Sequence, residues 1–205
     1  MTKSHNKNIA GFSLLELVIS MTITLILMAM AGAIFSHSIG TRERETRRTE
    51  AIIAVQSALN LISREVANSG YGLTDNGIVI ADSDAKSLHF RSNIHNEDAV
   101  TGSAGEDLMY FFEPNSSAIV RYDRFSVPQT STVIDRIGDL SFEYWDYPDF
   151  AAPPTFSNTP TADTARIRIT VTIHLAPVQG QPDNQEITYT SDVALRNSRY
   201  ISNQY

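Results

Sequence analysis

The hydrophobic and polar positions divide the chain into an apolar stretch near the start, an amphipathic stretch after it, and a long remainder of short apolar runs. The nineteen residues from Leu17 to Phe35 contain no charge and no proline. A helix rises about 1.5 Å per residue, so this stretch is long enough to cross a hydrocarbon layer of roughly 30 Å. The pattern predicts a membrane-spanning helix over residues 12–35.

The helical pattern continues beyond this stretch in a different form. Residues 41–50 are polar but rich in helix formers, and Gly70 and Gly72 supply a stop signal further on. We therefore expect one helix from about Ser13 to Ser69, with residues 36–70 as its amphipathic continuation. Its apolar stripe fits either a coiled-coil seam or a face packed on a sheet, and the strand-rich remainder favours the sheet. The stripe recurs at steps of three and four, over Ile52, Val55, Leu59, Ile62 and Val66.

Residues 71–205 have the pattern of a β-rich head. Apolar and polar residues alternate over Arg166–His174 and place four β-branched apolar residues on one face of the strand. This is typical of an antiparallel sheet with one face exposed to solvent. Pro114–Ser117 predicts a hairpin turn, whereas the proline-bearing stretches Tyr147–Asp163 and Pro177–Asn184 predict surface or partner-contact loops. The fold class expected is α+β, a long N-terminal helix packed on an antiparallel β-sheet. Its strands are expected at Gly77–Ala81, Ser87–Ser92, Asp107–Glu113, Ala118–Phe125, Asp139–Asp146, Ala165–His174 and Glu186–Leu195.

The charge and the absence of cysteine exclude several classes of function. The net charge is −7, and residues 71–205 alone hold nine Lys and Arg against eighteen Asp and Glu. Affinity for phosphate comes from Lys and Arg, so we expect no direct binding of nucleic acid. The chain has no cysteine, which excludes disulfides, thiolate metal sites and a cysteine nucleophile.

One charged residue, Glu16, lies at the start of the apolar stretch. A carboxylate at that depth costs roughly 2.5–3.5 kcal/mol on insertion scales. Glu16 therefore needs an interaction partner or a functional role that offsets this cost. A secretory signal peptide cut near Ala31–Ala33 would discard Glu16, and a plain signal anchor would leave it unexplained.

The residues around Glu16 carry a resemblance to a known family. Gly11-Phe12-Ser13-Leu14-Leu15-Glu16 resembles the processing site of type IV pilins and type II secretion pseudopilins. In that family a membrane peptidase cuts after the glycine, the new N-terminal residue is methylated, and a glutamate stands fifth. The resemblance implies cleavage after Gly11, methylation of Phe12, and an assembly contact between Glu16 and the Phe12 amine of a neighbouring subunit.

The resemblance also implies a cellular arrangement. Residues 1–11 would be a leader, and the helix would cross the cytoplasmic (inner) membrane once, N-terminus inside and head outside in the periplasm. Lys3 and Lys7 precede the span and four arginines follow it, so this orientation comes from the family and not from the charges. The implied partners are the prepilin peptidase and methyltransferase, other pilins or pseudopilins, and the inner-membrane assembly platform.

Three further segments narrow the resemblance. Leu61–Tyr71, Leu140–Trp145 and Val193–Asn197 are similar to minor pilins of the PilW type and to J-type minor pseudopilins. The implied function is a minor subunit that joins, primes or caps a type IV pilus or a secretion pseudopilus. A major filament subunit is the alternative within the family. A signal-anchored envelope enzyme or binding domain is the alternative outside it.

The sequence predicts neither an enzyme nor a cofactor site. Its five histidines lack metal-ligand spacing, and it contains no phosphate loop or Gly-x-Ser-x-Gly elbow. We therefore expect no catalytic residues and no metal ligands. Four residues are suggestive of calcium but fit a solvated turn better, namely Asp75, Asn76, Asp82 and Asp84.

Overall fold

The computed structural model describes residues 13–95, 102–125, 128–149, 152–175, 177, 182 and 184–203. The chain forms two units, and their described parts fall within residues 13–45 and residues 46–203. Helix α1 (Leu14–Val66) passes from the first unit into the second. The expected single helix is therefore confirmed, and it ends at Val66 instead of Ser69.

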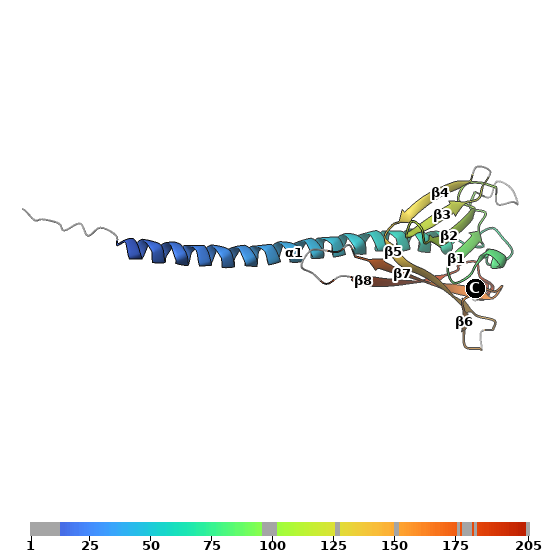
Figure 1. The fold of residues 1–205 in the computed structure, drawn as a ribbon. Coiled ribbons are helices and arrows are strands. Elements are labelled where there is room, and N and C mark those ends of the chain that lie inside the picture. The colour runs from blue at the N-terminus through green and yellow to red at the C-terminus, as the bar shows by residue number, and fades with distance from the viewer. Residues whose placement is uncertain are drawn as a thin grey trace, which may run out of the picture. The chain divides into compact units, whose positions relative to one another are not determined.

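The second unit, within residues 46–203, contains the strands, in two antiparallel four-stranded sheets (Figure 1). The first sheet has the order β1-β2-β3-β4 and the second the order β6-β5-β7-β8. The expected α+β fold with an antiparallel sheet is confirmed, but its strands divide between two sheets. The elements are η1 (Ile80–Asp82), β1 (Ser87–Arg91), β2 (Asp107–Glu113), β3 (Ala118–Asp123), β4 (Gln129–Ile134), β5 (Ile137–Asp146), β6 (Thr155–Ser157), β7 (Thr164–His174), β8 (Glu186–Ala194) and α2 (Arg199–Ser202).

Strand β7 is the strand that the alternation predicted. It pairs with β5 on one side and with β8 on the other. Its apolar residues are buried, while the polar residues between them are partly exposed. The predicted hairpin turn is also confirmed, because Glu113 at the end of β2 pairs with Ala118 at the start of β3. Ser117 closes this turn with φ of 48°.

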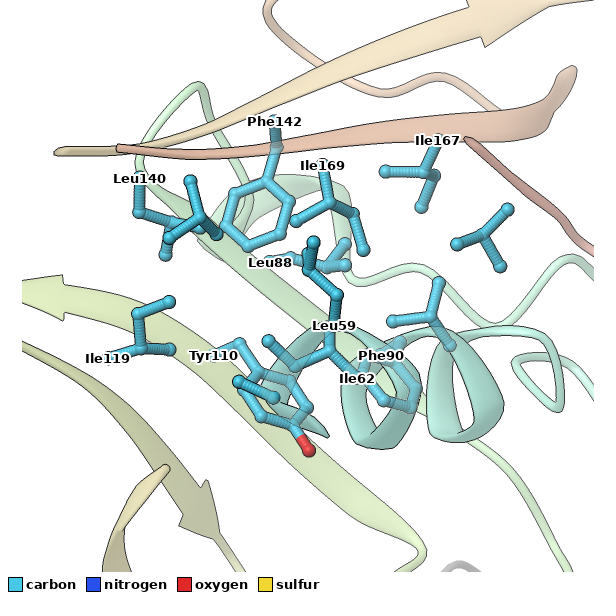
Figure 2. Packing of buried hydrophobic residues seen from close by; sticks show 14 of the residues in the cluster. Leu59, Ile62, Leu88, Phe90, Tyr110, Ile119, Leu140, Phe142, Ile167 and Ile169 are labelled. Atoms are coloured by element: carbon cyan, nitrogen blue, oxygen red, sulfur yellow. The ribbon is translucent and has the colours of Figure 1, made fainter. Parts of the chain in front are cut away.

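The hydrophobic core of the second unit joins the last turns of α1 to both sheets. The buried face of the helix is Val55, Ala58, Leu59, Ile62 and Val66, which matches the predicted stripe except at Ile52 and Ala58. Figure 2 shows Leu59 and Ile62 from the helix among side chains of both sheets. The stripe is thus a sheet-packing face. The other labelled side chains are Leu88, Phe90, Tyr110, Ile119, Leu140, Phe142, Ile167 and Ile169.

Two glycines fix the turn that follows the helix. Gly70 and Gly77 have φ of 77° and 76°, a region that suits glycine. The Gly70 backbone N–H donates to the Arg91 carbonyl, and the Arg91 N–H donates to the Gly77 carbonyl. A Cβ on Gly77 would meet backbone atoms at 2.2 and 2.3 Å, so this close approach needs glycine.

Two expectations about strands and loops are wrong, and one strand was missed. Gly77–Ala81 is not a strand: Ile78 makes a single bridge to Phe90, and η1 follows. The loop expected over Tyr147–Asp163 contains β6, which pairs with β5 at Trp145 and Phe156. Strand β4 was not expected, because its Gln, Thr and Ser residues show no clear alternation of apolar and polar positions.

Candidate functional site

The site predicted from the sequence begins at the start of α1. The Ser13 backbone N–H donates to Oε2 of Glu16 at 3.0 Å. Ser followed three residues later by Glu is a capping box, in which the Glu side chain satisfies a free N–H at the helix start. A carboxylate there also faces the positive end of the helix dipole. Glu16 thus has a partner within its own chain, while Gly11 and Phe12 lie outside the described residues.

Three hydroxyl side chains follow on the same helix. Ser20, Thr22 and Thr24 donate to the carbonyls four residues earlier, at 2.7, 2.8 and 2.7 Å. The structure thus places the hydrogens of these hydroxyl groups in bonds within the helix. Such bonds remove unsatisfied donors from a lipid environment. Each hydroxyl oxygen can still accept a bond from a neighbouring helix.

The surface of α1 from Leu14 to Ile39 is exposed and carries large apolar side chains on all sides, with a few polar residues such as Glu16 and His37 among them. A helix of this kind is stable only when lipid or other helices cover it. In the part of the chain that the structure describes, α1 is the helix that is long and apolar enough to cross a membrane. The exposed large apolar residues are Leu14, Leu15, Leu17, Val18, Ile19, Met21, Ile23, Leu25, Ile26, Leu27, Met28, Met30, Ile34, Phe35 and Ile39.

A polar cluster fixes the last turns of α1 on the first sheet. Tyr110 on β2 donates its hydroxyl to Oε2 of Glu65, and Arg121 Nε on β3 donates to the same oxygen at 3.0 Å. Burial and the Glu65 carboxylate hold the pKa of Tyr110 far above its ordinary value, so the phenol stays protonated and donates. Because the Glu65 and Arg121 side chains are about one-fifth exposed, this ion pair is only weakly screened by water.

We expect Glu65→Ala to lower the free energy of unfolding by about 1–3 kcal/mol, because Tyr110 and Arg121 would lose their shared acceptor. Urea unfolding of the full chain in detergent measures this change. Glu50→Ala is the matched control, since Glu50 is an exposed glutamate on the same helix. An effect of Glu65→Ala no larger than that of Glu50→Ala would contradict a stabilising role for the cluster.

A second polar cluster surrounds His89 on β1. The buried imidazole lies with Nδ1 2.9 Å from Asp82 Oδ2, and its Nε2 contacts Asp107 Oδ1. Arg124 and Arg91 each approach one of these carboxylates at 3.0 Å. Hydrogen bonds from His89 and then from Arg124 hold the pKa of Asp82 below its usual range.

This histidine has the neighbours of a structural residue. Both ring nitrogens face carboxylates, and the nearby Ser83 hydroxyl is bonded to backbone groups of Val79 and His89. The cluster therefore ties β1 to η1 and β2 and presents no nucleophile to the imidazole. Sequence reasoning missed this cluster and the Glu65 cluster, because their members are far apart along the chain.

The residues that suggested a calcium site form hydrogen bonds to separate partners. Asp75 accepts from the Gly77 N–H, and Asp84 accepts from the N–H groups of Lys86 and Ser87. The Asn76 amide donates to carbonyls of the segment 161–164. Within the described ranges, no three His, Cys, Asp or Glu side chains are grouped as metal ligands. These side chains act as turn and loop supports.

Comparison with known proteins places the likeness at the start of the chain. The family described as "Prokaryotic N-terminal methylation motif" matches residues 6–32, a range that contains Gly11, Phe12 and Glu16. Among solved structures, a type IV-like pilin from Thermus thermophilus is similar, with 12% identity over 72% of this chain and 98% of that chain, and a TM-score of 0.46. No curated protein matches the chain.

Proposed function

We propose that this chain, a type IV pilin-like protein that carries the N-terminal methylation motif, is a minor pilin-like or pseudopilin structural subunit. In this role the chain would be incorporated into a type IV pilus or a type II secretion pseudopilus, or it would prime or cap that filament. The observation that carries the proposal is the motif over residues 6–32, which overlaps the exposed, predominantly apolar first part of α1. A structural subunit, and not an enzyme, is the role that this arrangement serves.

The motif implies processing by the prepilin peptidase and assembly with other pilins. In our proposal the enzyme cuts after Gly11 and the new N-terminus at Phe12 is methylated. Residues 12–35 then lie in the inner membrane and residues 36–70 continue the helix. The head, residues 71–205, lies outside, in the periplasm. The assembly platform of the inner membrane is a further partner.

The minor role is supported by features of the sequence. The chain lacks the cysteines that form a C-terminal disulfide in many major pilins, and three segments are similar to minor subunits. A major subunit is the second candidate, and a high copy number in purified filaments would favour it. An anchored envelope enzyme would require a reproducible activity of the full chain.

The intact mass of the protein from native membranes tests the proposal. We expect a chain that starts at N-methylated Phe12 when the peptidase is present, and a chain that retains residues 1–11 when it is absent. Gly11→Val is expected to give the uncleaved mass in both strains, because the bulkier residue blocks the cut. Cleavage near Ala31–Ala33, or an uncleaved natural chain in the strain with the peptidase, would contradict the proposal.

A further inference from the structure

Strand β4 is an open edge of the first sheet. It is the last strand in the order β1-β2-β3-β4 and pairs only with β3. Within the described residues, none of its outward N–H and C=O groups has a partner. The side chains from Gln129 to Thr132 are exposed, and the strand carries no charge. Such an edge is a ready template for another strand.

Other long strand edges of the head are protected. The outer side of β1 is covered by the segment Gly77–Val79, which makes backbone hydrogen bonds to His89 and Arg91. Strand β8 carries Glu186 and Asp192, and its Ser191 contacts Ser63 of α1. Natural proteins cover or charge their edges in these ways. At β4 the protection is limited to Pro128 before the strand and a bulge near Val133.

A groove of about 570 Å³ lies beside this open edge. Residues of α1 and Val133 of β4 line it, so a strand added to β4 would continue the sheet over the helix face. Small residues on that face leave room for the inward side chains of such a strand. The lining residues are Ala54, Ser57, Ala58, Asn60, Leu61, Arg64 and Val133.

Arg64 gives the groove a positive charge, which favours an acidic occupant. Its side chain is exposed and has no ion-pair partner among the described residues. Its neighbour Glu65 is engaged by Tyr110 and Arg121 and points to the first sheet. An occupant that carries a carboxylate would complement Arg64, because a cation beside an apolar groove favours an opposite charge in the partner.

We propose that β4 and this groove bind an extended segment of a neighbouring filament subunit, added as a further antiparallel or parallel strand of the first sheet. The segment has small or apolar side chains facing α1 and an acidic residue opposite Arg64. The inference rests on the proposed function, since it places the neighbour in a filament. It goes beyond that function by assigning a specific surface of the head.

Thiol labelling tests the inference, because the chain has no cysteine of its own. A Thr132→Cys chain reacts with a maleimide probe, both in purified filaments and in membranes of a strain without the peptidase. We expect labelling to be slower in filaments by at least about tenfold, as for other sites that open only transiently. A Ser116→Cys chain, with its thiol on the exposed β2–β3 turn, is expected to label at equal rates.

Hydrogen exchange and two charge variants separate strand addition from simple shielding. The amides of 129–132 are expected to exchange more slowly in filaments than in unassembled chain. Thr132→Lys and Arg64→Glu are expected to reduce incorporation of the chain into filaments, while Ser116→Lys leaves it unchanged.

Equal labelling of the Thr132→Cys chain in both samples, with that chain present in filaments, would overturn the inference alone. Absence of the processed natural chain from filaments would overturn both the inference and the proposed function.

Discussion

A Glu16→Leu chain is expected to be cleaved after Gly11 like the natural chain, and to be depleted from filaments by at least about tenfold, the factor that corresponds to 1.4 kcal/mol. The reason is the proposed pairing of Glu16 with the Phe12 amine of a neighbour. The ratio of chain in the filament fraction to chain in the membrane fraction, by quantitative immunoblotting, measures the effect. Intact mass shows whether cleavage has occurred.

The expected size follows from the cost of charge in lipid. A carboxylate deep in a membrane costs roughly 2.5–3.5 kcal/mol, and an unpaired amine has a similar cost. Docking lets the two charges compensate one another, whereas removal of one leaves the other buried and unpaired. Glu16→Leu makes the single subunit more stable in the membrane and removes its gain on docking. A loss in filaments without a loss in membranes is therefore the distinguishing result.

The capping bond seen in the structure supplies the control. Glu16→Gln keeps an oxygen that can accept from the Ser13 N–H, but it removes the charge. If charge pairing drives assembly, Glu16→Gln is depleted from filaments as Glu16→Leu is. If both Glu16→Gln and the natural chain assemble equally while Glu16→Leu does not, the role of Glu16 is the helix cap, and the pairing is contradicted.

Local patterns explain what the sequence could predict. The period of three to four over Ile52–Val66 identified the packing face of α1, and the period of two identified β7. Both patterns arise within one element, because one face of it is buried. The bounds of β2 were predicted as observed, since turn residues follow it directly. The motif on which the resemblance rests is confirmed, because the family model of the N-terminal methylation motif matches residues 6–32.

Features that depend on distant partners were not predictable. Strand β4 has exposed residues along most of its length, so burial leaves no pattern in it, and pairing with β3 alone makes it a strand. The division into two sheets depends on which strands pair with one another, and these pairings join residues far apart along the chain. The Glu65 cluster joins residues 45 and 56 positions apart, and no local spacing reports such a contact. The cap between Ser13 and Glu16, in contrast, is a local motif that the sequence spacing alone could have indicated.

The largest stability effect is expected at Ile62, which is 0% exposed and lies between the two sheets (Figure 2). Ile62→Ala removes apolar atoms from the core and leaves a cavity that rigid strands on both sides cannot fill. Such changes cost about 2–5 kcal/mol, a large part of the stability of an ordinary domain. Urea unfolding of the full chain in detergent, followed by Trp145 fluorescence, is expected to show a lower midpoint with an unchanged slope.

Ile53→Ala is the matched control, because it makes the same chemical change on the same helix at a side chain that is 61% exposed. Its expected cost is within about 0.5 kcal/mol, and the better helix propensity of alanine offsets part of the lost contact. Since Ile62 belongs to the same core as both sheets, the strands would lose a shared packing surface if the helix detached. Equal midpoints for the two variants would mean that the last turns of α1 contribute little to the core, and that the strands fold without them.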